Sequence, residues 1–142
     1  MTERNETTCS VCDFTLYNHV PAKVLQISHV GVYNDDRFPG RSILTLNHHE
    51  TNFETLDMSI MFQFMKDVQT VINAIKTVTK TDRVNIAILG NTVNHVHAHL
   101  IPRYPNNEEF PNKSPWNDKR INRELPEEEI THIMGLLGKE LN

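Results

Sequence analysis

The chain has 142 residues, of which 38% are hydrophobic and 23% charged, and this composition predicts one globular domain with its own core. Its formal net charge of −4 comes without a dense run of Lys and Arg, which argues against a long nucleic-acid groove because neutralising phosphates requires clustered cations. No apolar run approaches the roughly 20 residues that span a membrane, and the N-terminus lacks a signal-peptide segment, so we expect a cytoplasmic protein.

The first third of the chain carries strand and turn signals. Residues 24–34 are β-branched and partly alternating, which predicts strands with a tight reversal near residues 28–31. The sequence DDRFPG then brings Asp, Pro and Gly together and predicts a turn. Residues 41–47, RSILTLN, predict another strand.

The remainder predicts two helices and a further pair of strands. A long helix is expected from an N-cap at Asp57 to about Lys80, because apolar residues recur there at steps of three and four. Residues 83–91 predict a strand that pairs antiparallel with the segment after it. A last helix is expected to start near Pro126, with three glutamates at the positive end of its dipole. These elements make an α+β domain.

The segment 95–104, HVHAHLIPRY, places three of the eight histidines at alternate positions. On a strand, these histidines would share one face, while Val96, Ala98 and Leu100 would face the long helix. Three imidazoles in register are too many for an ordinary half-exposed face. They predict either a metal site or a nucleophilic imidazole whose neighbours orient it and handle protons.

This pattern resembles the His-φ-His-φ-His-φ-φ motif of the histidine triad (HIT) family of nucleotidyl hydrolases and transferases, in which φ is apolar. The resemblance covers about residues 9–104 in the same order: CSVC, then YNDDRFPG and an apolar strand ending in NHH, then NIAILGN before the histidines. It implies a single HIT domain over residues 1–142, with residues 105–142 as a C-terminal extension. It also implies an antiparallel sheet of about five strands, one long helix packed on it, a C-terminal helix, and a homodimer.

The resemblance further implies a mechanism centred on His97. In the family, the middle histidine attacks the α-phosphorus of a nucleotide, and water later cleaves the nucleotidyl-histidine without a metal. The substrate would carry an AMP-like group, as in a dinucleoside polyphosphate or a nucleoside phosphoramidate. His99 would contact the phosphate and the departing group, and the backbone carbonyl of His95 would hold the tautomer of His97.

Five other residues match positions that bind substrate in the family. Asn34 or Asp35 stands where members hold the ribose hydroxyls, and Asn91 and Thr92 stand where members place donors to the phosphate. Arg41 replaces a histidine that many members have after the PG pair. An arginine binds phosphate through several donors, but it cannot shuttle protons at pH 7.

A structural zinc site is also implied, because some bacterial members bind zinc through a C-x-x-C pair and two histidines. The matching residues are Cys9, Cys12, His49 and His95, with His48 as the alternative to His49. Two thiolates and two imidazoles make a closed tetrahedral ligand set. The alternative for the cysteines is packing as reduced thiols.

Two other functions stay open from the sequence. The chain is a metal-dependent hydrolase if the histidine row binds the metal, and a nucleotide-binding protein without catalysis if Arg41 reflects lost activity. Trp116 has two interpretations, stacking on a nucleotide base or anchoring its loop as a buried aromatic, and the second is favoured.

Overall fold

The strands form one antiparallel sheet of five strands in the order β1-β2-β3-β5-β4. The computed structural model describes residues 18–90 and 94–142. The strands in chain order are β1 (Asn18–Val20), β2 (Ser28–Val32), β3 (Ser42–Leu46), β4 (Val84–Ala87) and β5 (His97–Pro102). The helices are α1 (Met58–Thr79) and α2 (Glu127–Glu140), with two 3₁₀ turns, η3 (Phe53–Thr55) and η4 (Pro115–Asn117).

This architecture confirms the predicted α+β fold of five antiparallel strands, a long helix and a C-terminal helix. The long helix begins after Asp57 at its N-cap and ends at Lys80, which has a left-handed backbone with φ of 58°. The side chain of Asp57 makes no capping hydrogen bond. The predicted antiparallel pairing of the strand in 83–91 with the histidine segment is confirmed, since β4 pairs with β5 from Val84↔Pro102 to Ala87↔His99.

The predicted reversal near residues 28–31 is wrong. Residues 28–32 form one continuous strand, in which Gly31 pairs with His19 on β1 and with Ile43 on β3. The chain reverses instead between β1 and β2. Alternate residues Ser28, Val30 and Val32 are buried on one face of β2, and this burial outweighs the turn preference of Gly31.

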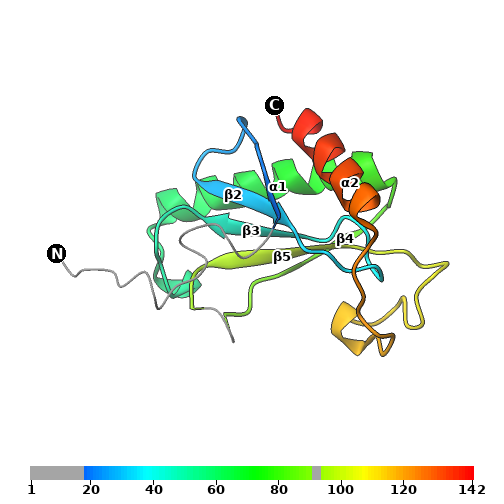
Figure 1. Cartoon of the computed structure of the whole chain (residues 1–142). Coiled ribbons are helices and arrows are strands. Elements are labelled where there is room, and N and C mark those ends of the chain that lie inside the picture. The colour runs from blue at the N-terminus through cyan, green and yellow to red at the C-terminus, as the bar shows by residue number, and fades with distance from the viewer. Residues whose placement is uncertain (1–17, 91–93) are drawn as a thin grey trace.

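The main core lies between the sheet and α1. Buried side chains from both layers meet there, among them Val30, Leu44, Phe64, Val71, Ile75, Ala98 and Leu100. The second helix adds Ile130 and Leu137 to the same core, and it contacts α1 and β1. Figure 1 shows α1 along one side of the sheet and the chain that carries η4 on the other. No helix within the described ranges is both long and apolar enough to cross a membrane.

Residues 103–125, which we call the C-terminal segment, follow β5 and bring η4 next to His99, on the face of the sheet opposite α1. At its start, the Tyr104 hydroxyl donates to the carbonyl of Pro39. At its end, the backbone N–H of Leu125 donates to the Asn34 side-chain oxygen at 2.8 Å. The N–H of Asp36 donates to the carbonyl of Arg123 at the same distance. These contacts hold the segment against the loop between β2 and β3.

Candidate active site

His97 lies at the start of β5, opposite Thr45 of β3, and it is buried, with an exposed fraction of 7%. Its Nδ1 lies 2.6 Å from the backbone carbonyl of His95. Because a carbonyl only accepts, Nδ1 carries the proton, and the lone pair of the neutral ring is on Nε2. The backbone therefore fixes the tautomer in which Nε2 is the nucleophilic atom.

His99 lies two residues further on the same face of β5 and is half-buried. Its ring centroid is 5.2 Å from that of His97 and 5.3 Å from the Trp116 ring, which it meets at 87°. Burial, followed by the nearby charges of His97 and Arg41, lowers the pKa of His99 to about 4. His99 is therefore neutral at pH 7.

Arg41 comes from the end of the β2–β3 loop and is buried, with an exposed fraction of 6%. Its Nη1 lies 2.9 Å from Oδ2 of Asp35, and its guanidinium carbon lies 4.0 Å from the Tyr33 ring centroid and 5.8 Å from that of Trp116. Asp35 also pairs with Arg37. The two arginines and the single carboxylate together carry one positive charge beside the histidines.

His95 precedes β5, and its ring centroid lies 5.0 Å from that of His49. Its Nε2 lies 2.7 Å from the carbonyl of Leu46, so Nε2 carries the proton and Nδ1 holds the lone pair. That Nδ1 lies 3.2 Å from Nδ1 of His49. Tetrahedral zinc with Zn–N bonds of 2.0–2.1 Å separates two ligand nitrogens by about 3.3–3.4 Å, so this pair is suited to share such an ion. His48 is exposed.

Of the six other predicted site residues, the structure describes Asn34 and Asp35. Asn34 and Asp35 lie in the β2–β3 loop next to Arg41, where the oxygen of Asn34 is engaged by the C-terminal segment and Asp35 by the two arginines. Four predicted residues lie outside the described ranges: Cys9, Cys12, Asn91 and Thr92.

The HIT domain family matches residues 28–106, more than half of the chain. The chain belongs to the HIT family. An uncharacterized HIT-like protein of Methanocaldococcus jannaschii is 30% identical over 104 residues, covering 68% of this chain and 79% of the relative. A histidine triad protein from Bradyrhizobium japonicum has a similar structure, with a TM-score of 0.76, 25% identity, and coverage of 88% of this chain and 92% of the other.

Two further HIT structures share the fold at lower identity. The diadenosine triphosphate hydrolase of Plasmodium falciparum superimposes with a TM-score of 0.58 at 22% identity, covering 87% of this chain and 82% of the other. A zinc-bound histidine triad family protein from Mycobacterium smegmatis has a TM-score of 0.70 at 18% identity, covering 96% and 95%. At these identities the likeness establishes the fold alone.

A cavity of about 260 Å³ opens beside the His95–His97 end of the HIT motif. It is lined by the loop before α1, the end of β4 and the residues that lead into β5, including Asn52, Glu54, Leu89, Asn94 and His97. The cavity has room for a phosphate group next to the imidazole. Sequence analysis did not identify the residues of the loop before α1, since nothing in the HIT motif marks them.

Two aromatic residues of this HIT protein complete the surroundings of His99 and Arg41. Trp116 is 51% exposed, so the interpretation of this residue as a buried anchor is wrong: η4 is a short surface turn that presents the ring to the active site. Tyr33, which sequence analysis did not single out, lies under the Arg41 guanidinium. Its position next to Asn34, a predicted site residue, could have indicated that Tyr33 lies at the site.

The histidine row does not have the geometry of a three-histidine metal site. His97 directs Nδ1 at a carbonyl, and His95 directs its lone pair toward His49 instead. Within residues 18–90 and 94–142, no three His, Cys, Asp or Glu side chains are arranged to hold a metal ion. The geometry thus favours a nucleophilic imidazole over a metal held by the row.

Proposed function

We propose that this HIT protein is a nucleotide hydrolase, with nucleotidyl-transfer chemistry, that cleaves at the α-phosphate of an AMP-like substrate through a covalent intermediate on His97. The observation that carries the proposal is the 2.6 Å contact from His97 Nδ1 to the His95 carbonyl, which directs the reactive lone pair to Nε2. The substrate class rests on membership of the HIT family, which includes a diadenosine triphosphate hydrolase.

The proposed reaction has two displacement steps. The lone pair of His97 Nε2 attacks the α-phosphorus, a P–N bond forms, and the P–O or P–N bond to the leaving group breaks with its electron pair. Water then attacks the same phosphorus and releases a proton to solvent, the bond to Nε2 breaks, and the electron pair returns to the ring. AMP is released, and the Nδ1 proton stays hydrogen-bonded to the His95 carbonyl throughout, which stabilises the positive charge of the nucleotidyl-imidazolium.

The remaining predicted residues receive binding roles in this proposal. His99 and Arg41 contact the phosphate and the leaving group from the side opposite the cavity, and Asn91 and Thr92 donate to the phosphate. Of the two candidates for the ribose hydroxyls, Asn34 is preferred to Asp35. The reason is that each carboxylate oxygen of Asp35 already accepts two hydrogen bonds from Arg37 or Arg41, whereas the oxygen of Asn34 accepts one, from Leu125.

We also propose a structural zinc ion held by Cys9, Cys12, His49 and His95. The facing Nδ1 atoms of the two histidines and the Leu46 carbonyl on the far nitrogen of His95 support it, because ligand histidines commonly donate their other N–H to a carbonyl. Such an ion takes no part in the displacement steps. It fixes His95, whose carbonyl in turn orients His97.

The test of the function compares wild type with His97→Ala in AMP release from diadenosine tetraphosphate, in a buffer with chelator. We expect wild type to release AMP, and the variant to be slower by about a thousandfold or more, because the nucleophile is gone. His132→Ala, a substitution of an exposed histidine on α2, is the matched control. Circular dichroism in the same buffer checks that each protein is folded.

Mass spectrometry of the quenched wild-type reaction should find one AMP unit on the peptide that contains His97. A requirement for added metal in wild type that still holds its structural zinc would contradict the proposal and favour a metal-dependent hydrolase. AMP binding without turnover of any nucleotide would contradict it in favour of a binding protein.

The zinc proposal is tested by metal content. We expect about one zinc per chain in wild type and in His48→Ala, and loss of zinc from His49→Ala and from the double variant Cys9→Ser/Cys12→Ser. Zinc retained at full content in the double variant would show that these thiols are not ligands.

A further inference from the structure

Two polar atoms at the active site are buried and lack a partner. Nε of Arg41 and Nδ1 of His99 have essentially no accessible surface, and neither has a hydrogen-bond partner among the described residues. Leaving such a group unsatisfied usually costs about 1–3 kcal/mol, and native structures contain few of them. Unsatisfied groups gathered at a functional site indicate that a ligand completes the hydrogen bonds.

Trp116 contacts the side chains of both His99 and Arg41. Its ring lies edge-on to the ring of His99 and within 5.8 Å of the guanidinium carbon of Arg41, while half of its own surface is exposed. The backbone hydrogen bonds of its turn run within residues 114–118, and the carboxylate of Asp118 ties the turn to Arg120. Because half of the surface of Trp116 is already in solvent, a rotation of this one side chain is an inexpensive way to open both polar atoms to a ligand.

The charge at this place selects the ligand. Arg41 is always protonated, and Asp35, which pairs with it, also pairs with Arg37, so a positive charge is left over. The neutral ring of His99 adds a hydrogen-bonding group without a charge. A cation beside a neutral donor attracts a phosphate oxygen and repels an ammonium group.

We infer that Arg41 and His99 clamp the leaving group, that Trp116 closes over it, and that the charge of Arg41 makes the site select phosphate leaving groups over amines. This inference rests on the proposed function. It favours dinucleoside polyphosphates over nucleoside phosphoramidates, the two substrate classes that the function leaves open. With a polyphosphate substrate, the bridging P–O bond breaks and the oxygen departs with the electron pair as a nucleotide anion held by Arg41. With a phosphoramidate, the departing nitrogen needs a proton as well as the electron pair.

The protonation of His99 supports the same preference. A pKa of about 4 means that few His99 rings hold a second proton at neutral pH, so His99 rarely has a proton to donate to a departing amine. An arginine cannot give up its proton to replace it. A phosphate leaving group is stable as an anion and needs no proton in this step.

A basic cavity lies next to the clamp and has room for the rest of such a leaving group. It has a volume of about 560 Å³ and is lined by Arg83 and Lys113, among others, with Ser114 adjoining the η4 turn. Asn85 in its wall pairs with Ile101, two residues beyond His99 on the same face of the sheet. A chain of phosphates that leaves His97 past His99 therefore meets further positive charge.

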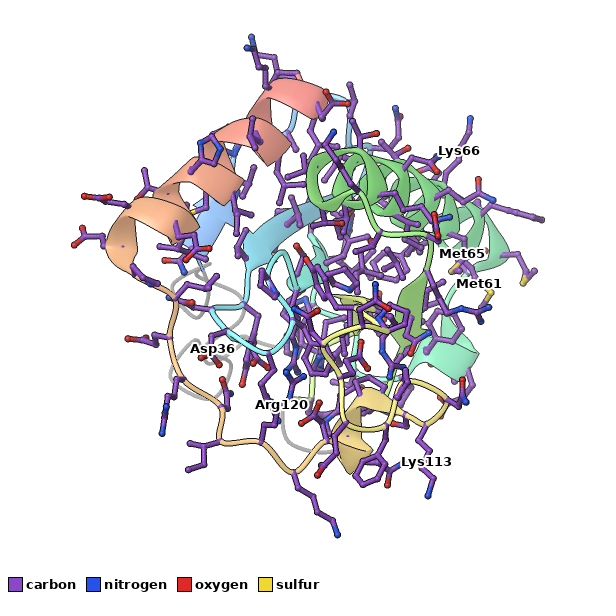
Figure 2. The ribbon with its side chains drawn as sticks, turned by 90° about the vertical axis from the view of Figure 1, so that its right-hand side faces the viewer. Asp36, Met61, Met65, Lys66, Lys113 and Arg120 are labelled. Carbon is purple, nitrogen blue, oxygen red and sulfur yellow. The ribbon has the colours of Figure 1, made fainter. Side chains whose placement is uncertain are left out.

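The kinetic test uses the selectivity ratio, defined as kcat/KM for diadenosine tetraphosphate divided by kcat/KM for adenosine 5′-phosphoramidate. Each variant is assayed on both substrates in one preparation, so the folded fraction cancels. We expect Arg41→Gln to lower the ratio about tenfold or more, the size of a lost hydrogen bond to a charged group, and Arg41→Lys to retain most of it. Lys66→Gln removes the same charge from α1, on the opposite side of the molecule from Lys113 (Figure 2), and should leave the ratio unchanged.

A binding test is independent of turnover. Trp116 is the only tryptophan in the chain, so its fluorescence reports directly on the clamp. We expect inorganic pyrophosphate to change the emission saturably in wild type and in Lys66→Gln, and much more weakly in Arg41→Gln.

The outcomes separate the clamp from the proposed function. Turnover of both substrates with an equal selectivity ratio in wild type and Arg41→Gln overturns the clamp and leaves the function standing. Absence of both turnover and AMP on His97 overturns the function, and the pyrophosphate titration then decides on the clamp. Wild-type emission that does not respond to pyrophosphate overturns the clamp, including the case in which Arg41→Gln fails to fold.

Discussion

Asp35 has no exposed surface, yet it carries a carboxylate in the loop between β2 and β3. Burial on its own raises the pKa of Asp35, but hydrogen bonds from the side chain and backbone of Arg37 and from Arg41 outweigh it and hold the pKa below the ordinary value of 3.8. The carboxylate is thus charged at every physiological pH. It fixes Arg41 against Tyr33 and so determines where the positive charge of the active site lies.

Replacing Asp35 with Ala should lower the free energy of unfolding by about 3 kcal/mol or more, because two largely buried guanidinium groups lose their counter-charge. The full decrease in the free energy of unfolding should be seen above pH 3.8. It should shrink as the pH falls through the depressed pKa, where the wild-type carboxylate is itself neutralised. Urea unfolding followed by circular dichroism at several pH values measures this dependence.

Asp118→Ala is the matched control for that experiment. Asp118 pairs with Arg120, whose side chain is 35% exposed, so removing Asp118 leaves a partly solvated cation and the loss should be smaller than that of Asp35→Ala. Equal losses for the two variants would mean that Asp35 does not hold buried charge.

At the scale of elements, local patterns were sufficient for most of the fold. The stripe of α1, the apolar runs of β3 and β4 and the alternation of β5 each follow from the spacing of apolar residues, and all were predicted. The reversal at 28–31 was misplaced because Gly31 has the composition of a turn, while its strand is determined by pairing with β1 and β3. Long-range pairing of this kind leaves no local signal.

The same limit applies to the active site. The histidine motif identifies His97 and His99, because their spacing alone places them on one face of a strand. Trp116 and Tyr33 reach this face from the C-terminal segment and from the end of β2, and only the folded chain brings them to His99 and Arg41. The clamp is therefore a property of tertiary structure.

The β2–β3 loop is shaped by Gly40, which has a φ of +94°. A Cβ at this position would lie 2.6 Å from Cγ2 of Thr79, the last residue of α1. Gly40→Ala should therefore lower the free energy of unfolding by about 1–3 kcal/mol from the backbone strain, and more if Thr79 cannot move. Because Arg41 follows directly, the selectivity ratio should fall as well.

Gly135→Ala should change the free energy of unfolding in the opposite direction to Gly40→Ala. Gly135 lies in α2, and a Cβ added to it would meet no other described side chain or loop within 4 Å, so alanine should raise the free energy of unfolding by about 0.5–1 kcal/mol. Both variants are measured by urea unfolding. A Gly40→Ala protein as stable as wild type would show that the loop can adopt another backbone without cost.

At the scale of the whole molecule, the α1 side of the sheet leaves large apolar side chains in solvent. Met58 and Phe62 on α1 are 58% and 71% exposed, and Ile86 on β4 is 47% exposed. β4 is also an edge strand, paired only with β5 among the described strands. An exposed apolar side chain on an open strand edge, such as Ile86, is a candidate for a protein contact.

The resemblance to the HIT family implies a homodimer, and we expect its contact at the edge of β4. Ile86 pairs with Leu100, so its side chain lies on the same face of the sheet as α1, and a charge there would be buried in the contact. Sedimentation velocity should find a dimer for wild type and a monomer for Ile86→Lys at the same concentration. Ile121→Lys is the control, because Ile121 is 70% exposed but belongs to the C-terminal segment on the other face, and this variant should stay dimeric. A monomeric wild type would contradict the homodimer. A dimer that survives Ile86→Lys and dissociates with Ile121→Lys would place the interface on the other face of the sheet.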